Sequence, residues 1–223
     1  MTFAVNFVKF QLNIGYMKYN IAVFGSGRGS NFNSVLNAIR ECKLRSNINV
    51  VISNNSKAGI LEIAREQRIP TFHISSKTEK SDEELNLKIL KILEEHHTDF
   101  ILLAGYMKKI DLSIISKYKD RIINIHPSLI PSFCGDKMYG ENVHKAVLDY
   151  GCKVTGVTVH LVDEEYDRGA IIIQKAVEVF DNDDTKTLAA RVLEAEHKLI
   201  VDAIKLFEDD KITISGRRVI RRN

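Results

Sequence analysis

The feature of the sequence that most constrains the fold is a regular alternation of short apolar runs with segments of helical periodicity. The apolar runs lie at residues 20–25, 48–53, 71–74, 99–105 and 121–126. Segments with apolar residues at helical spacing stand between the first four runs, at residues 31–42, 57–67 and 81–96. This order of strand and helix predicts a doubly wound, Rossmann-like parallel sheet over roughly residues 18–126.

The pattern changes after residue 126. Two long apolar runs, residues 153–163 and 170–180, are separated by only six residues, which predicts an antiparallel pair. An amphipathic helix follows from about Asp184, with one apolar face. That face is formed by Leu188, Val192, Ala195, Leu199, Ala203 and Ile204. We therefore predict an α/β fold whose sheet is mostly parallel with an antiparallel C-terminal part. Without an internal repeat or a low-complexity linker, we expect residues 17–223 to form one domain.

The first 16 residues do not fit this pattern. They contain one lysine and no arginine, serine or acidic residue. A signal peptide would need a basic start and a small-residue cleavage site, and a transit peptide would need arginine and serine. We expect residues 1–16 to be either a disordered extension or a stretch that precedes a true start at Met17.

Composition excludes several classes of protein. The net charge of +3 is too small to indicate nucleic-acid binding, and no apolar run approaches the roughly 18 residues of a membrane span. Cys42, Cys134 and Cys152 are scattered without a CxxC motif, which argues against a disulfide framework and a zinc site. We expect a cytoplasmic protein without a metal ion. The basic residues 216–222 are predicted to be a solvated tail.

A glycine-rich loop, "GSGRGSN" at residues 25–31, connects the first predicted strand and helix. Ser30 stands where the dinucleotide motif needs its third glycine, and the second strand ends in "SNN" rather than an acid. The free N–H groups of a helix N-terminus still favour an anion, so Gly29, Ser30 and Asn31 are candidates for binding one phosphate monoester. An ordinary tight turn with Ser30 as the helix N-cap is supported equally well by the spacing.

The stretch "RIINIHPSLIP" at residues 121–131 ends a predicted core strand with Asn-x-His-Pro. Strand alternation puts Asn124 and His126 on one face, at the carboxyl edge where open parallel sheets bind ligands. An amide beside an imidazole suits a reaction that develops negative charge on a carbonyl oxygen. The alternative is a hydrogen-bonded pair in the core.

A cluster of acids, within residues 163–167, follows the next predicted strand. One of these acids facing the edge of the sheet could pair with His126. A carboxylate near an imidazole raises its pKa, so His126 could hold a proton at neutral pH. Spacing does not show which acid does this.

Five segments together resemble the phosphoribosylglycinamide formyltransferases, a family among the enzymes that use 10-formyltetrahydrofolate. They are residues 25–32, 101–108, 124–133, 157–174 and 193–197. The resemblance extends over about residues 18–208. It implies transfer of a formyl group from 10-formyltetrahydrofolate, the co-substrate, to the amine of glycinamide ribonucleotide in de novo purine biosynthesis.

The resemblance also implies roles for individual residues. Asn124, His126 and Asp167 match the catalytic residues of the family. Gly29, Ser30 and Asn31 match its substrate-phosphate loop, and Glu196 matches a residue that contacts the glycinamide substrate. The residues matching its folate site are Met107, Lys108, Lys109, Ile110, Asn124, Asp163, Glu164, Glu165, Tyr166 and Asp167.

Two positions depart from the family pattern. Lys108 stands where many members carry arginine, so a bidentate contact there becomes a point charge. An arginine often found before the third helix is not obvious within residues 75–84, and Lys80 is our candidate for the folate tail.

Other functions fit less well. A deformylating hydrolase of the same cofactor would carry "HHS" where this chain has "HPS", and a methionyl-tRNA formyltransferase would need more than residues 209–223 for its nucleic-acid domain. A non-catalytic Rossmann-type binding protein is disfavoured by the missing ribose acid and by the Asn-x-His strand end. We expect small-molecule substrates, with no nucleic-acid or membrane partner; the sequence does not indicate the oligomeric state.

Overall fold

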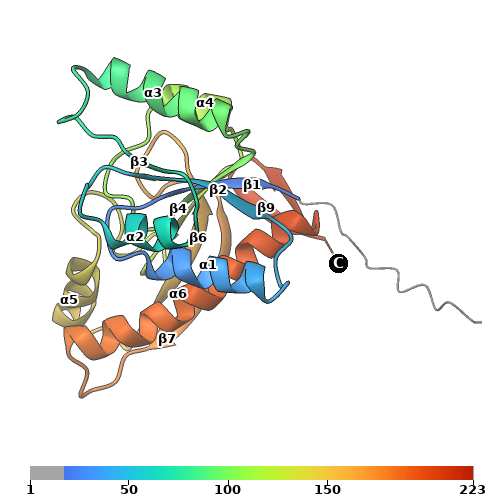
Figure 1. The fold of residues 1–223 in the computed structure, drawn as a ribbon. Helices are drawn as coiled ribbons and strands as arrows, with labels where there is room; N and C mark the ends of the chain where they lie inside the picture. The colour runs from blue at the N-terminus through green and yellow to red at the C-terminus, as the bar shows by residue number, and fades with distance from the viewer. Residues whose placement is uncertain (1–17, 223) are drawn as a thin grey trace, which may run out of the picture.

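A nine-stranded sheet forms the centre of the computed structural model, which describes residues 18–222 (Figure 1). The strand order is β3-β2-β1-β4-β5-β6-β7-β9-β8. The expectation for residues 1–16 concerns a part of the chain outside the described residues. Within residues 18–222, none of the helices combines the length and apolar character needed to cross a membrane.

The first half of the sheet is parallel, as predicted. Its strands are β1 (Asn20–Phe24), β2 (Asn47–Ser53), β3 (Thr71–His73), β4 (Phe100–Leu103) and β5 (Ile122–His126). Neighbouring strands in this half pair parallel. β1 and β4 are almost wholly buried, which is why they appear in the sequence as continuous apolar runs rather than alternating ones. All five strands therefore point their carboxyl ends to one edge of the sheet.

The second half reverses direction. β6 (Val154–Leu161) pairs antiparallel with both β5 and β7 (Ile171–Glu178), which confirms the predicted antiparallel part.

The prediction of a solvated C-terminal tail is right about exposure but wrong about structure, because the segment forms a strand. β8 (Ile212–Ser215) and β9 (Arg218–Arg221) form a hairpin, and β9 meets β7 at the Ile171–Arg218 pair. Ile214 and Val219 pack against the core, and the arginines on β9 are exposed. The basic composition indicated exposure correctly, but it did not reveal the two apolar anchors.

Helices cover both faces of the sheet (Figure 1). α1 (Ser30–Arg40), α2 (Gly59–Glu66), α5 (Glu141–Tyr150) and α6 (Thr185–Glu208) contribute to one apolar core. α3 (Asp82–Glu95) and α4 (Leu112–Lys117) contribute to a second core on the opposite face. The predicted face of α6 is buried except at Ala195, which is partly exposed.

The C-terminal end of α6 is anchored by a buried carboxylate. Glu208 is 1% exposed, and its oxygens accept hydrogen bonds from the Arg45 N–H at 2.9 Å and the Ser46 N–H at 2.8 Å. The Ser46 hydroxyl donates a third, at 2.6 Å. These bonds fix α6 against the start of β2. The other side chains of α6 therefore have a defined position over the sheet.

Candidate active site

A cavity of about 770 Å³ opens at the carboxyl edge of the parallel strands. It is lined by the loops after β1 and β4, the end of β5, the segments 135–141 and 160–167, and one face of α6. Of the predicted site residues, the cavity collects Gly29, Ser30, Asn31, Met107, Lys108, Lys109, Ile110, Asn124, His126, Asp163, Glu165, Tyr166, Asp167 and Glu196. Glu164 and Lys80 do not line it.

The glycine loop presents the N-terminus of α1 to this cavity. Gly29 is the N-cap residue, with a φ of 85°, and Ser30 is the first residue of the helix. Of the two possibilities that the spacing left open for this turn, the one with Ser30 as the N-cap is therefore wrong. A Cβ on Gly29 would lie 2.9 Å from the Ile60 Cα, so close packing of α2 and the left-handed backbone both require glycine here. No side chain caps α1, so its first N–H groups are available to an anion.

A carboxyl group stands beside this loop. The Asn31 amide donates to Glu196 Oε2 at 2.6 Å, and Asn31 Oδ1 is buried with no hydrogen-bond partner among the described residues. Burial raises the pKa of Glu196 to about 6, against the opposing effect of the Asn31 hydrogen bond. An uncapped helix N-terminus and a carboxyl group with a raised pKa therefore share one wall of the cavity.

Asn124 and His126 lie on the same face of β5, as strand alternation predicts. Each has a partner directly opposite on β6, which is His160 for Asn124 and Thr158 for His126. The Asn124 amide nitrogen is 3.2 Å from His160 Nε2 and 3.4 Å from Asp167 Oδ1. Both Asn124 and His126 line the cavity.

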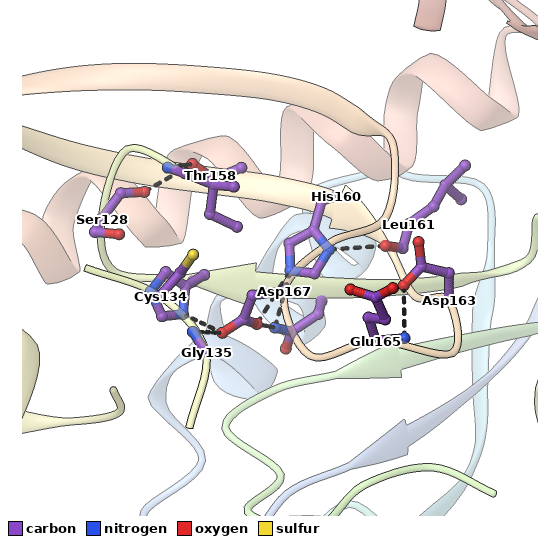
Figure 2. A network of polar contacts seen from close by, with 12 residues as sticks. Ser128, Cys134, Gly135, Thr158, His160, Leu161, Asp163, Glu165 and Asp167 are labelled. Carbon is purple, nitrogen blue, oxygen red and sulfur yellow. Dashed lines mark hydrogen bonds and ion pairs between the residues drawn. The ribbon is translucent and has the colours of Figure 1, made fainter. Parts of the chain in front are cut away.

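Asp167 is the acid that meets His126. Its Oδ2 lies 3.6 Å from His126 Nδ1. The same oxygen accepts the Gly135 N–H at 2.9 Å (Figure 2). Asp163 and Glu165 face the cavity elsewhere, where Asp163 Oδ1 accepts the Glu165 N–H. Spacing left four acids as possible partners of His126, and the structure identifies Asp167 as the one beside it.

The surroundings of Asp167 keep it ionised. Burial alone would raise its pKa, but His160, His126 and the Gly135 N–H together hold the pKa below its ordinary value. Its backbone is left-handed, with a φ of 53°, a conformation that aspartate tolerates better than most residues.

The pKa of His126 shifts in the direction opposite to the one expected. Burial is the largest influence and lowers it, whereas the Asp167 carboxylate and the Phe133 carbonyl only partly oppose this. His126 is 4% exposed, so the desolvation of a charged imidazole outweighs a carboxylate at 3.6 Å. His126 Nε2 lies 2.9 Å from Phe133 O, and since a carbonyl can only accept, Nε2 carries the hydrogen.

The role of His160 could not be found from its local sequence. Its Nδ1 donates to Leu161 O at 2.7 Å (Figure 2). Its Nε2 lies 3.2 Å from the Asn124 amide nitrogen and 3.5 Å from Asp167 Oδ1, so His160 contacts both of these side chains. The signal that identifies it is the register of β5 and β6, which the sequence does not contain. His144, also left unassigned, lines the cavity from α5, Arg28 lines it from the glycine loop, and Lys186 lines it from the first turn of α6.

The loop after β4 forms another wall. The Met107 N–H donates to Ser26 Oγ at 2.8 Å, which ties this loop to the glycine loop. Met107 and Tyr166 are 45% and 49% exposed, so both present apolar surface near the cavity. Among the described residues, no cluster of histidine, cysteine and acidic side chains is arranged to hold a metal ion.

The sequence and the fold place the chain in one family of proteins. Residues 19–204 match the formyl transferase family, and the chain belongs to it.

Relatives of known function carry a more particular name. The chain is 36% identical over 184 residues to phosphoribosylglycinamide formyltransferase of Bacillus subtilis, covering 82% of this chain and 92% of that protein. It is 39% identical over 193 residues to the chloroplastic phosphoribosylglycinamide formyltransferase of Arabidopsis thaliana, covering 86% of this chain but only 66% of the plant protein.

One solved structure is similar over nearly the whole chain. Glycinamide ribonucleotide transformylase 1 from Symbiobacterium toebii superposes with a TM-score of 0.87 at 35% identity. The match covers 94% of this chain and 96% of that one.

Proposed function

We propose that this protein is a phosphoribosylglycinamide formyltransferase, which moves a formyl group from 10-formyltetrahydrofolate to the primary amine of glycinamide ribonucleotide in de novo purine biosynthesis. The observation that carries the proposal is that one cavity holds both an uncapped helix N-terminus and the Asn124–His126–Asp167 group. The first element suits a phosphate, and the second suits a carbonyl carbon under attack. The relatives named above carry this activity in their names.

The ribonucleotide phosphate would bind the N–H groups of Gly29, Ser30 and Asn31. Arg28, within the same loop, lines the cavity and would add positive charge near the phosphate. Glu196, on the same wall as Asn31, would contact the polar groups of the glycinamide substrate. The substrate amine would then point from this wall toward β5.

The folate would occupy the opposite wall. Its pterin would lie against Met107–Ile110 and the 163–167 segment, where Asp163, Glu165 and Tyr166 line the cavity. Glu164 would contribute only through its place in this segment, because its side chain lies outside. Lys108 and Lys109 are the cations on this wall, and the position of Lys80 away from the cavity gives it no support as a folate ligand.

In the reaction the neutral amine attacks the formyl carbon, a new C–N bond forms, and the carbonyl oxygen gains negative charge. A protonated His126 would stabilise this oxyanion through its positive charge, and the Asn124 amide would stabilise it through its N–H dipole. Asp167 faces His126 Nδ1, so it would stabilise the proton that burial alone disfavours. Breaking the bond to the folate nitrogen transfers the formyl group, and a water molecule would carry the amine proton to that nitrogen.

The test is release of tetrahydrofolate from 10-formyltetrahydrofolate with and without glycinamide ribonucleotide. We expect release only with the acceptor, and a turnover lower by about 100- to 1000-fold in His126→Ala. Equal release without the acceptor would indicate the hydrolase instead. Near-normal turnover of His126→Ala would refute the assigned mechanism.

We further propose that residues 17–223 act as one catalytic domain in the cytoplasm, without a metal ion or a nucleic-acid partner. The single sheet over residues 18–222 and the family match over residues 19–204 support one domain. Activity unchanged after dialysis against a chelator, and its recovery in the cytosolic fraction, are the expected outcomes.

A further inference from the structure

A row of polar side chains crosses three strands beside the proposed catalytic residues. His126 on β5 is paired with Thr158 on β6, and Thr158 is paired with Gln174 on β7. Directly opposite residues of antiparallel strands point to the same face of a sheet, so the three side chains form one line. Thr158, in the middle of this row, is 0% exposed, and Gln174, at one end of the row, is exposed.

The hydroxyl of Thr158 binds the loop that leaves β5. It donates to Ser128 O at 2.7 Å (Figure 2) and accepts the Ile130 N–H at 3.1 Å. The Gln174 amide donates to it at 2.9 Å and also donates to Ile130 O at 3.0 Å. A hydroxyl has one donor and two acceptor positions, so all of its hydrogen-bonding capacity is used.

The same loop carries the acceptor for the His126 imidazole. His126 Nε2 donates to Phe133 O at 2.9 Å, and the Ser128 hydroxyl donates to Ser132 O at 2.6 Å. Phe133 has a φ of 50°, a left-handed conformation that an aromatic residue keeps only when its surroundings hold it. Holding Ser128 and Ile130 in place therefore holds the Phe133 carbonyl.

We infer that Thr158, supported by Gln174, is a positioning residue for the formyl transfer proposed above: it holds the 128–133 loop so that the Phe133 carbonyl keeps the hydrogen of His126 on Nε2. With that hydrogen on Nε2, Nδ1 is directed at Asp167. If the Phe133 carbonyl moved, the His126 imidazole could exchange tautomers or rotate. Its Nδ1 would then no longer face the Asp167 carboxylate. This inference rests on the proposed function for its kinetic consequence but not for its structural one.

Three substitutions distinguish the effect of the Thr158 hydroxyl from the effect of the side chain's shape. Thr158→Val keeps the volume and removes all three hydrogen bonds, whereas Thr158→Ser keeps the hydroxyl and is the matched control. Gln174→Met removes the outer support and leaves the Thr158 hydroxyl in place. Gln174 is at the exposed end of the row, so we expect Gln174→Met to fold. The inference can therefore be tested with Gln174→Met if Thr158→Val fails to fold.

The direct measurement is the tautomer of His126, by nitrogen-15 NMR of the imidazole in the full chain. We expect the Nε2–H form in the wild type and in Thr158→Ser, and a mixture of forms in Thr158→Val. Loss of the Nε2–H preference in Thr158→Ser as well, or its retention in folded Thr158→Val and Gln174→Met, would overturn the inference. This result does not depend on any activity, so it is distinguishable from a failure of the proposed function.

The kinetic measurement is formyl transfer to glycinamide ribonucleotide. Misplacing a reacting group by about 1 Å lowers turnover by about 100-fold, so we expect Thr158→Val to lower kcat by about 10- to 100-fold. The KM for the ribonucleotide should stay within about twofold, because the phosphate loop is on α1. Gln174→Met should show a smaller loss in kcat, and Thr158→Ser should restore it. A folded Thr158→Val with wild-type kcat would overturn the kinetic role.

Discussion

Glu196→Gln should stabilise the protein above neutral pH. Burial raises the pKa of Glu196 to about 6, from an ordinary value of 4.5. The folded protein therefore holds this proton more tightly than the unfolded chain does. As the pH rises from about 4.5 to 6, ionising the carboxyl in the folded state costs more than in the unfolded state, and wild-type stability falls. A glutamine of nearly the same shape carries no such penalty.

The magnitude follows from the two pKa values. They differ by about 1.5, and one pKa unit corresponds to about 1.36 kcal/mol, so the penalty reaches about 2 kcal/mol above about pH 7. For a chain of this size, about 2 kcal/mol corresponds to roughly 4–8 °C in Tm. Glutamine can still accept the Asn31 amide through its oxygen, so this hydrogen bond is retained.

The assay is denaturant unfolding of the wild type and Glu196→Gln at several pH values from 4 to 8. Glu194→Gln, exposed on the same helix, is the control and should differ from the wild type by less than about 0.5 kcal/mol at each pH. We expect the Glu196→Gln difference to be absent below about pH 4.5 and complete by about pH 7. A difference that does not vary with pH, or one of opposite sign, would refute the reasoning.

Three further outcomes are expected. Asp167→Asn keeps a residue that tolerates the left-handed backbone but removes the charge that opposes the effect of burial on the His126 pKa. The kcat should fall by about 100-fold or more, and NMR titration should show a lower His126 pKa. An unchanged titration would contradict the assignment of Asp167. Gly29→Ala places a Cβ 2.9 Å from the Ile60 Cα, so Tm should fall and the KM for the ribonucleotide should rise about 10-fold or more; unchanged kinetics would place the phosphate elsewhere. Glu208→Ala leaves the Arg45 N–H and the two buried Ser46 donors without an acceptor and should lower the free energy of unfolding by about 3 kcal/mol or more in denaturant titrations. A loss below about 1 kcal/mol would show that water replaces the carboxylate.

The sequence predicts the parallel half of the fold well because its strands are buried on both faces and appear as continuous apolar runs. It misses α5, whose N-cap is Gly140 without a side-chain cap and whose buried residues are only Val143, His144 and Val147. It also misses the six-residue α4, which is too short for its periodicity to be recognised. Where a helix is short or buries few residues, local sequence contains little of the information that defines it.

The residues of the candidate active site were also predictable from the sequence only in part. Asn124 and His126 share a strand, so alternation alone places them together. Asp167 and His160 join them only through the register of β5 and β6 and the path of the following loop, which depend on tertiary packing. The pKa of His126 depends on two opposing effects of the folded state, and the sequence indicates the nearby acid but not the extent of burial.

The reversal of strand direction between β5 and β6 has a consequence for how activity is assembled. Asn124 lies 36 residues before His160 and 43 residues before Asp167, so the Asn124 amide is synthesised well before these two partners. A chain cut between Gly135 and Gly140 would leave the phosphate loop, Asn124 and His126 on one fragment and His160 and Asp167 on the other. Neither piece alone would transfer formyl groups, and recovery of turnover on mixing would measure how tightly the two halves of the sheet recognise each other.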